Sequence, residues 1–247
     1  MTDSILILSD IHGNLSALDA VIGDFESKNY HPGCIALLGD NINYGMRPNE
    51  VLERLKELSC KYDIKVNIMG NHEKALLDYD TSHFSTDRGR RILDYTRNIL
   101  TPESLEYIDG MTKEGYSEME IGGKHILFLH GNIDDCFWGK LNNKTVDDVR
   151  YSAYDYVISG HSHVPHLIEH FFSVDNLEYR NKKRTIFINP GSVGQPRNHN
   201  PRAQYAYVNL GQEIFVFNSV NYDIDSERAL FTDGVDRFYS DRLINGI

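Results

Sequence analysis

Residues 5–14 read Ile-Leu-Ile-Leu-Ser-Asp-Ile-His-Gly-Asn, and this stretch decides the fold. Its four apolar residues predict a short buried strand, and Asp10 and His12 follow directly at the carboxyl end of that strand. The residues after them carry apolar side chains at the spacing of one helical face, namely Leu15, Leu18, Val21, Ile22 and Phe25. The stretch therefore predicts a strand, a polar loop and an amphipathic helix in succession.

The same unit recurs twice more before residue 80. Ile35–Leu38 is a second apolar run that leads to Asp40, and Lys65–Met69 is a third that leads to Asn71. A strand, a loop and a helix about every 30 residues predict an α/β fold with parallel strands and helical crossovers. Asp10, Asp40 and Asn71 are 30 and 31 residues apart, so we expect them to meet at one edge of the sheet.

Strands predominate beyond residue 115. Two runs at 116–121 and 124–129, joined by Gly122-Gly123, predict a β-hairpin. Further strands are expected at 154–158, 165–172, 184–188, 203–210 and 213–220, with short helices after Asp225. No low-complexity linker divides the chain, so we expect a single domain over residues 1–247.

The charge and the cysteines exclude several classes of protein. The 247 residues carry 25 Lys and Arg against 36 Asp and Glu, a formal net charge of −11. Such a surface disfavours a stable nucleic-acid partner and a polybasic membrane binder. Three widely spaced cysteines argue against a disulfide framework, and no apolar run approaches the ~18 residues of a membrane span. We expect a soluble cytoplasmic protein without a signal peptide, and the sequence carries no signal for its oligomeric state.

Five of the eleven histidines lie on loops that follow predicted strands. His12 and His72 belong to the loops described above, His130 follows the strand at 124–129, and His161 and His163 follow the strand at 154–158. A single Asp-x-His is usually a pair of ordinary polar surface residues. Taken alone, His161 and His163 could be one core and one surface histidine. Together with the loop that carries Asp40, these make five polar loops, each directly after a predicted strand. Such a set instead predicts a metal site.

Seven residues are candidate ligands: Asp10, His12, Asp40, Asn71, His130, His161 and His163. A set dominated by imidazoles suits Mn²⁺, Fe²⁺, Zn²⁺, Co²⁺ or Ni²⁺ rather than Ca²⁺ or Mg²⁺. Seven ligands are too many for one tetrahedral ion and fit two ions that share a bridging carboxylate. Such a pair would bind phosphoryl oxygens and turn a bridging water into a nucleophilic hydroxide near neutral pH.

The chain resembles calcineurin-like metallophosphoesterases in five motifs of matching order and spacing: Asp10-x-His12, Gly39-Asp40, Gly70-Asn71-His72-Glu73, His130 and Gly160-His161-x-His163. The segment 189–197, Asn-Pro-Gly-Ser-Val-Gly-Gln-Pro-Arg, resembles the one that follows in bacterial members. The resemblance covers residues 5–210. It implies a four-layer α/β/β/α sandwich of two mixed sheets, with a binuclear metal centre on one edge.

Carried over by position, the resemblance implies two ion sites that share Asp40. One ion would be held by Asp10, His12, Asp40 and His163, and the other by Asp40, Asn71, His130 and His161. Mn²⁺ is favoured for both sites. His72 would face the substrate as a general acid or hydrogen-bond donor. Glu73 is expected only as a first-turn charge that is favourable to the helix dipole.

The sequence departs from the Ser/Thr protein phosphatases of this family at three positions. Asn43 replaces an acid that partners the catalytic histidine, Tyr44 replaces a phosphate-binding arginine, and Met69 replaces the arginine before Gly-Asn-His-Glu. This version is similar instead to the bacterial group named for diadenosine tetraphosphatase and related phosphodiesterases. Arg197 and Arg202 are candidates to bind substrate in place of the missing arginine, with solvated loop positions as the alternative.

The sequence thus predicts a metal-dependent phosphoesterase for a phosphodiester or another small phosphorylated substrate. Two alternatives remain open. A non-catalytic protein-docking scaffold of the same fold is disfavoured because His72 and all seven ligands are intact. A nuclease acting on short oligonucleotides is disfavoured by the acidic charge. In each case we expect residues 78–111 and 131–149 to form the walls of the cleft.

Overall fold

The computed structural model describes residues 3–232 and 234–247, which form two five-stranded sheets. The first sheet has the strand order β10-β9-β1-β2-β3. Its strands are β1 (Ser4–Leu8), β2 (Cys34–Leu37), β3 (Ile64–Asn67), β9 (Ala203–Asn209) and β10 (Ile214–Val220). β1, β2 and β3 are parallel, as the repeated strand-loop-helix unit predicts, whereas β9 and β10 pair antiparallel.

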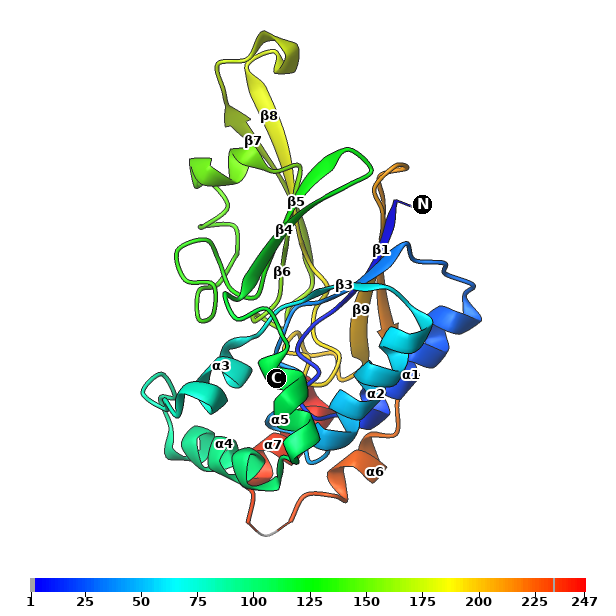
Figure 1. The fold of residues 1–247 in the computed structure, drawn as a ribbon, viewed down its shortest axis with the longest axis vertical. Helices are drawn as coiled ribbons and strands as arrows, with labels where there is room; N and C mark the ends of the chain where they lie inside the picture. The colour runs from blue at the N-terminus through cyan, green and yellow to red at the C-terminus, as the bar shows by residue number, and fades with distance from the viewer. Residues whose placement is uncertain (1–2, 233) are drawn as a thin grey trace.

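The second sheet has the order β4-β5-β6-β8-β7. Its strands are β4 (Tyr116–Ile121), β5 (Lys124–Leu129), β6 (Tyr156–Ser159), β7 (His166–Ser173) and β8 (Lys182–Asn189). The predicted hairpin of β4 and β5 is confirmed, β5, β6 and β8 run parallel, and β7 is antiparallel to β8. β7 and β8 extend beyond the body of the molecule, with the short 3₁₀ helix η2 (Leu177–Tyr179) at their tip (Figure 1).

The two sheets pack face to face through apolar side chains. Ile5 and Ile7 of β1 point into the core between the sheets, whereas Leu6 and Leu8 point to the opposite face and contact helices. Side chains alternate between the two faces of a strand, and both faces of β1 are buried. This is why β1 appears in the sequence as an unbroken apolar run.

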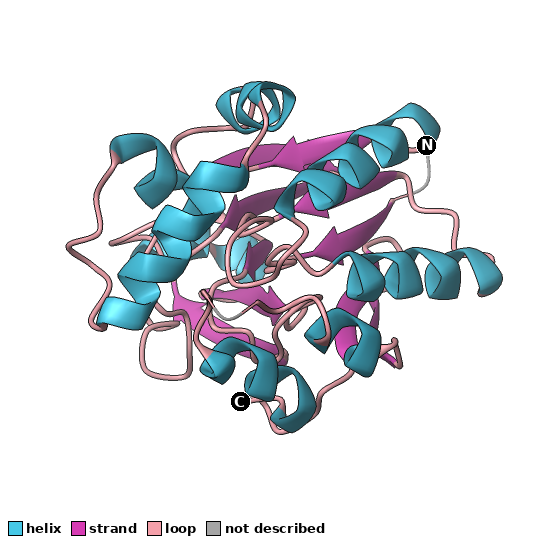
Figure 2. Cartoon of the chain, turned by 90° about the horizontal axis from the view of Figure 1, so that it is seen from below, coloured by secondary structure: helices cyan, strands magenta, loops and turns pink. Residues whose placement is uncertain are grey.

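Helices and loops cover the outer faces of the two sheets (Figure 2). α1 (Leu15–Ser27), α2 (Pro48–Lys61) and α5 (Pro102–Asp109) bury their apolar sides against the first sheet. The second sheet is covered by the loop that follows β5 and by the short 3₁₀ helix η1 (Val149–Ala153), through Leu141, Val146 and Tyr151. The predicted α/β fold with two mixed sheets is confirmed, and its fourth layer is thin.

The remaining helices gather at the end of the molecule opposite the β7–β8 hairpin (Figure 1). They are α3 (Asn71–Asp78), α4 (Asp87–Ile99), α6 (Ile224–Arg228) and α7 (Arg237–Asn245). Ile92 of α4 packs against Tyr239 of α7, and the buried Glu227 of α6 pairs with Arg47. None of the helices in the described parts of the chain is long and apolar enough to cross a membrane.

Loops from both sheets meet at one edge of the sandwich. The Asp10 amide donates to the Gly39 carbonyl at 3.0 Å, which joins the loops after β1 and β2. The Gly160 amide donates to the His130 carbonyl at 3.0 Å, and the Gly194 amide donates to the Asp10 carbonyl at 3.0 Å. This backbone network brings the predicted ligands of the two sheets together.

Candidate metal centre

The backbone at the candidate ligands is strained. Five of the seven adopt left-handed conformations, with φ of 55° at Asp10, 50° at His12, 54° at Asp40, 62° at His161 and 58° at His163. Residues other than glycine rarely occupy this region, at a cost on the order of 1–3 kcal/mol each. Strain concentrated at the ends of several strands is typical of a functional site.

Two glycines allow the loops after β2 and β3 to approach closely. Gly39 has φ of 88°, and a Cβ atom there would lie 2.2 Å from the Gly70 nitrogen. A Cβ atom on Gly70 would lie 2.1 Å from Oδ1 of Asp40. Side chains at these positions would therefore displace the Asp40 carboxylate.

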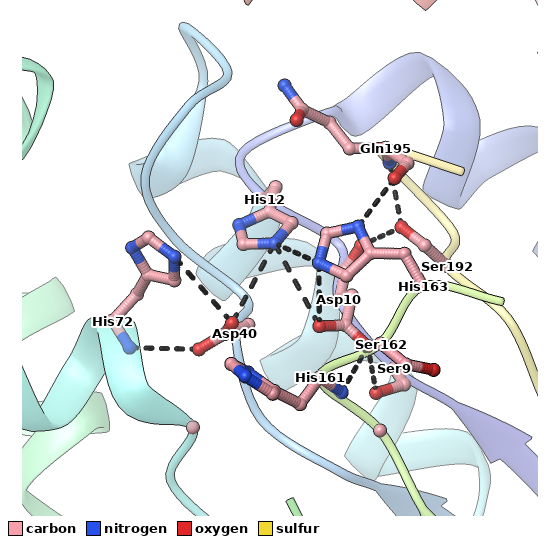
Figure 3. Close-up of polar contacts among 12 residues, drawn as sticks. Ser9, Asp10, His12, Asp40, His72, His161, Ser162, His163, Ser192 and Gln195 are labelled. Carbon is pink, nitrogen blue, oxygen red and sulfur yellow. Dashed lines mark hydrogen bonds and ion pairs between the residues drawn. The ribbon is translucent and has the colours of Figure 1, made fainter. Parts of the chain in front are cut away.

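The first ligand cluster consists of buried side chains whose ligand atoms lie within 4.8 Å of one another: Asp10, His12, Asp40 and His163. His163 Nε2 is 3.1 Å from Asp10 Oδ1 and 3.1 Å from His12 Nε2. His12 Nε2 is also 3.8 Å from Asp40 Oδ2 (Figure 3). The second oxygen of Asp10 accepts hydrogen bonds from the Ser9 hydroxyl and the His161 amide, so its Oδ1 is left facing the histidines.

The second cluster contains Asp40, His130 and His161, with Asn71 beside them. His130 Nε2 lies 3.3 Å from Asp40 Oδ2. The Asn71 amide oxygen is 3.0 Å from His130 Nε2 and 2.9 Å from His161 Nδ1. Asp40 Oδ2 therefore faces nitrogens of both clusters, while Asp40 Oδ1 accepts a hydrogen bond from the His72 amide at 2.9 Å.

Backbone carbonyls fix the orientation of three imidazoles. The Nδ1 atoms of His12, His130 and His163 lie 3.1, 2.7 and 2.5 Å from the carbonyls of Ile42, Leu38 and Gln195 respectively. A carbonyl only accepts, so each Nδ1 carries a proton, and in the neutral ring Nε2 is then the nitrogen that can bind a metal. Ligating histidines in proteins are held by this kind of contact.

This arrangement fits divalent cations. Two lone pairs of His12 and His163 face each other at 3.1 Å, which no hydrogen bond explains. The buried Oδ1 of Asp10 has no hydrogen-bond partner among the described residues. Burial lowers the pKa of His12 and His163 well below the ordinary histidine value, which favours the neutral form that binds metals. A cation between these donors would satisfy all of them.

Glu73 does more than place a negative charge in the first turn of a helix. It lies in the first turn of α3, as expected, but it is fully buried. Its carboxylate accepts hydrogen bonds from the amides of Asp40, Asn41 and Gly70 at 2.9, 2.7 and 2.9 Å. Glu73 therefore clamps the loop that carries Asp40 onto the start of α3. The Gly-Asn-His-Glu motif contained this residue, but its distant backbone partners could not be read from the sequence.

His72 lies beside the clusters and takes its orientation from Asn43. The Thr96 hydroxyl donates to the Asn43 amide oxygen at 3.1 Å, so the Asn43 amide nitrogen donates to His72 Nδ1 at 2.6 Å. The proton of a neutral His72 is then on Nε2, which is 3.8 Å from Asp40 Oδ2 (Figure 3). Burial lowers the pKa of His72 to about 4. His72 thus presents a neutral N–H beside the clusters.

Residues 4–213 match the family model of the calcineurin-like phosphoesterase superfamily domain. The chain belongs to this superfamily. A relative named MJ0912, from Methanocaldococcus jannaschii, is 31% identical over 233 residues, which cover 91% of this chain and 89% of the relative. The ordered motifs of the sequence predicted this membership, and the comparison confirms it.

Solved structures agree with the assignment. A metallophosphoesterase from Sphaerobacter thermophilus superposes with a TM-score of 0.75 and 27% identity, covering 99% of both chains. Protein PH1004 from Pyrococcus horikoshii superposes with a TM-score of 0.79 at 22% identity, covering 99% of this chain and 98% of its own. The second likeness shows the shared fold.

A cavity of about 390 Å³ opens in front of the phosphoesterase ligand clusters. Asp40, Asn71, His72, His161 and His163 form its floor. Its walls include residues from both segments expected to line the cleft, among them Phe84, Arg88, Trp138 and Lys140. The prediction of these two walls is confirmed. The volume is that of a small-molecule site.

The structure separates the two arginines predicted to bind substrate. Arg197 lines the cavity, and its amide donates to the His163 carbonyl at 3.2 Å. Arg202 is exposed, its Nε donates to the Asn221 side chain at 3.0 Å, and it is absent from the described cavity wall. Arg202 therefore lies at a solvated loop position, which was the alternative to substrate binding. Substrate binding by Arg197 stays a prediction.

The sequence did not reveal that α7 closes the cavity. Phe238, Tyr239 and Arg242 of this helix line the cavity, as Trp138 does. Tyr239 stacks on Tyr44, with ring centroids 4.9 Å apart and planes at 21°. The sequence predicted short helices after Asp225 but not what they pack against. That depends on contacts across nearly 200 residues of chain.

Proposed function

We propose that the protein is a metal-dependent phosphoesterase that hydrolyses a phosphodiester or another small phosphorylated substrate at a binuclear centre. The observation that carries this proposal is the pair of ligand clusters that share Asp40. Membership of the calcineurin-like phosphoesterase superfamily supports it. We infer a reducing, cytoplasmic setting from the three unpaired cysteines, Cys34, Cys60 and Cys136.

The residues of the two clusters would hold the ions in fixed positions. Asp10, His12, Asp40 and His163 would bind one ion, and Asp40, Asn71, His130 and His161 the other. When bound, two divalent ions, with Mn²⁺ favoured, supply charge for the phosphoryl oxygens and water acidic enough to attack near neutral pH. The carbonyl contacts to Nδ1 hold the imidazoles so that little reorganisation accompanies the reaction.

His72 would assist the leaving group from the cavity floor. Asn43 donates to its Nδ1 and so keeps the proton on Nε2, and the neutral ring donates a hydrogen bond rather than acting as a strong imidazolium acid. A hydrogen bond to the leaving oxygen gains strength as the phosphorus–oxygen bond breaks, because negative charge then develops on that oxygen. In this role Asn43 is a positioning residue for His72.

Small substrates are favoured over phosphoproteins. The cavity wall includes residues of α7 together with the aromatic side chains of Phe84 and Trp138. The Tyr44 ring packs against His12 and His72, with centroid distances of 4.6 and 4.5 Å, in place of a phosphate-binding arginine. A half-buried tyrosine at this position leaves the recognition of charged groups to other residues of the wall.

A substrate panel tests the proposal. Mn²⁺-loaded protein is assayed with bis(p-nitrophenyl) phosphate, p-nitrophenyl phosphate, a phosphoserine peptide, a dinucleoside polyphosphate and a short oligonucleotide. We expect two ions per chain by elemental analysis, and a higher kcat/KM for the small diester than for the peptide. A kcat/KM for the peptide equal to or above that for the diester would contradict the proposed specificity. Two bound ions without turnover of any compound would favour the scaffold alternative.

A further inference from the structure

The cavity wall carries a chain of three arginines that leads away from the metal centre. Arg197 follows β8, Arg242 lies on α7 and Arg88 lies on α4, and all three line the same cavity. Arg197 lies next to the metal centre, since its amide donates to the carbonyl of the candidate ligand His163 at 3.2 Å. Arg242 is close enough to Arg197 and Arg88 that their charges, together with burial, lower its own pKa to about 10.

No Asp or Glu side chain of the described structure pairs with these three arginines. Arg242 Nε donates to the backbone oxygen of Ile247, which leaves the terminal nitrogens of its guanidinium as donors. Asp40, which belongs to the metal centre, is the only acidic side chain among the described residues of the cavity wall. The acids next to the arginines in sequence are engaged elsewhere: Asp87 pairs with Arg90, and Asp241 pairs with Arg228. Three arginines without an Asp or Glu partner, in a protein of net charge −11, indicate a local site for an anion.

The arginine side chains are also held in place and keep hydrogen-bond donors that have no partner. The Phe238 ring lies 3.7 Å from the guanidinium carbon of Arg88 and 5.0 Å from that of Arg242. One aromatic face thus orients two planar guanidinium groups, which limits the conformational entropy lost on binding. The buried Nε of Arg197 has no hydrogen-bond partner among the described residues. These donors suit the several oxygens of a phosphoryl group.

We propose that Arg242 and Arg88 form a second anion site, which binds a phosphoryl group of the substrate other than the one being hydrolysed. Arg197, between this site and the metal centre, bridges the two groups. The substrate class is then a phosphoric anhydride or a bisphosphate rather than a compound with a single anionic group. This inference rests on the proposed phosphoesterase function and narrows its substrate.

The test compares three chromogenic probes with the same leaving group. The first, thymidine 5′-(p-nitrophenyl phosphate), has one anionic group. The second carries an additional 3′-phosphate, and the third is the p-nitrophenyl ester of thymidine 5′-diphosphate. We expect the wild-type kcat/KM to be at least about tenfold higher for one of the two-anion probes, because each charge-assisted contact is worth that much or more. The second and third probes distinguish a bisphosphate from an anhydride.

Variants attribute the preference to particular residues. Arg242→Gln and Arg88→Gln should each reduce the two-anion to one-anion ratio of kcat/KM by about tenfold. Arg202→Gln, outside the cavity, should leave the ratio unchanged. Arg88 lies on α4 and makes no hydrogen bond or ion pair among the described residues, so Arg88→Gln removes a charge without breaking such a contact. A ratio near one in the wild type, or a preference retained in both variants, would overturn the second site.

A binding measurement separates failure of this inference from failure of the proposed function. Calorimetric titrations compare inorganic pyrophosphate with inorganic phosphate on Mn²⁺-loaded wild type, Arg242→Gln and Arg202→Gln. Chelation affects all three proteins equally, so the comparison isolates the arginine. A preference for pyrophosphate over phosphate that falls about tenfold only in Arg242→Gln would support the second anion site. If no probe were hydrolysed as well, that result would count against the phosphoesterase function but not against the site. Equal preferences in all three proteins would overturn the site.

Discussion

The floor and the outer wall of the cavity are made from different kinds of structure. The floor comes from the loops directly after β2, β3 and β6. Most of its side chains are buried, and Asp40, His161 and His163 lie on strained backbone. The outer wall comes from α4, α7 and the loop around Trp138, with partly exposed side chains on ordinary helices. The floor holds the groups that would perform the chemistry, whereas the wall holds those that would choose the substrate. Strand ends give precise positions, and packed helices give surfaces that vary more easily.

The largest effect should come from the shared carboxylate of the floor. Asp40→Ala removes the carboxylate that faces both clusters, so we expect loss of both ions and a fall in kcat/KM of several orders of magnitude. His12→Ala should weaken only the ion of the first cluster. Elemental analysis after Mn²⁺ reconstitution checks both variants. A full complement of metal in Asp40→Ala would show that Asp40 does not bridge.

The next effect separates His72 from the ligands beside it. His72→Asn should lower kcat by roughly 10²–10⁴-fold for a poor leaving group while both ions stay bound. The loss should shrink for a strongly acidic leaving group, which needs little assistance. Paired substrates with good and poor leaving groups, together with metal analysis, check this. Lost metal, or an equal loss on both substrates, would remove His72 from that role.

The contrast between floor and wall also explains what could be predicted from the sequence. Asp10, Asp40 and Asn71 follow apolar runs at nearly equal spacing, and parallel strands bring such residues to one edge whatever the details of packing. Short-range pattern was therefore enough to predict the floor and the α/β fold. The family resemblance supplied the division into two ion sites and the second sheet.

Long-range packing was not accessible in the same way. Arg242 lies on a short helix with no motif, and its place in the cavity wall depends on the stacking of Tyr239 on Tyr44. Arg197 and Arg202 looked equivalent in sequence, and only the fold turns one into the cavity and the other to the surface. The left-handed backbone at the ligands was also unexpected, because aspartate and histidine in sequence give no sign of positive φ.

A backbone change tests the floor without altering any ligand. In Gly70→Ala the new Cβ atom would lie 2.1 Å from Asp40 Oδ1, so the carboxylate must move. We expect metal affinity to fall by about 10–100-fold, as for other residues that support ligands from behind. Gly23→Ala is the matched control, since nothing lies within 4 Å of its added Cβ atom on α1. Unchanged metal affinity in Gly70→Ala would mean that the floor tolerates displacement of Asp40.

The smallest effect should come from the junction of floor and wall. Arg197→Gln removes a cation next to the metal centre, and one charge-assisted hydrogen bond to phosphate is worth about 1.5 kcal/mol or more. If Arg197 binds the substrate equally in its ground and transition states, KM should rise about tenfold while kcat stays the same. Arg202→Gln should change neither constant, because its guanidinium pairs with Asn221 on the surface. Steady-state kinetics with the small diester measures both variants. A fall in kcat in Arg197→Gln would assign Arg197 to transition-state stabilisation and so to the floor, whereas no change in either constant would leave it without contact to this substrate.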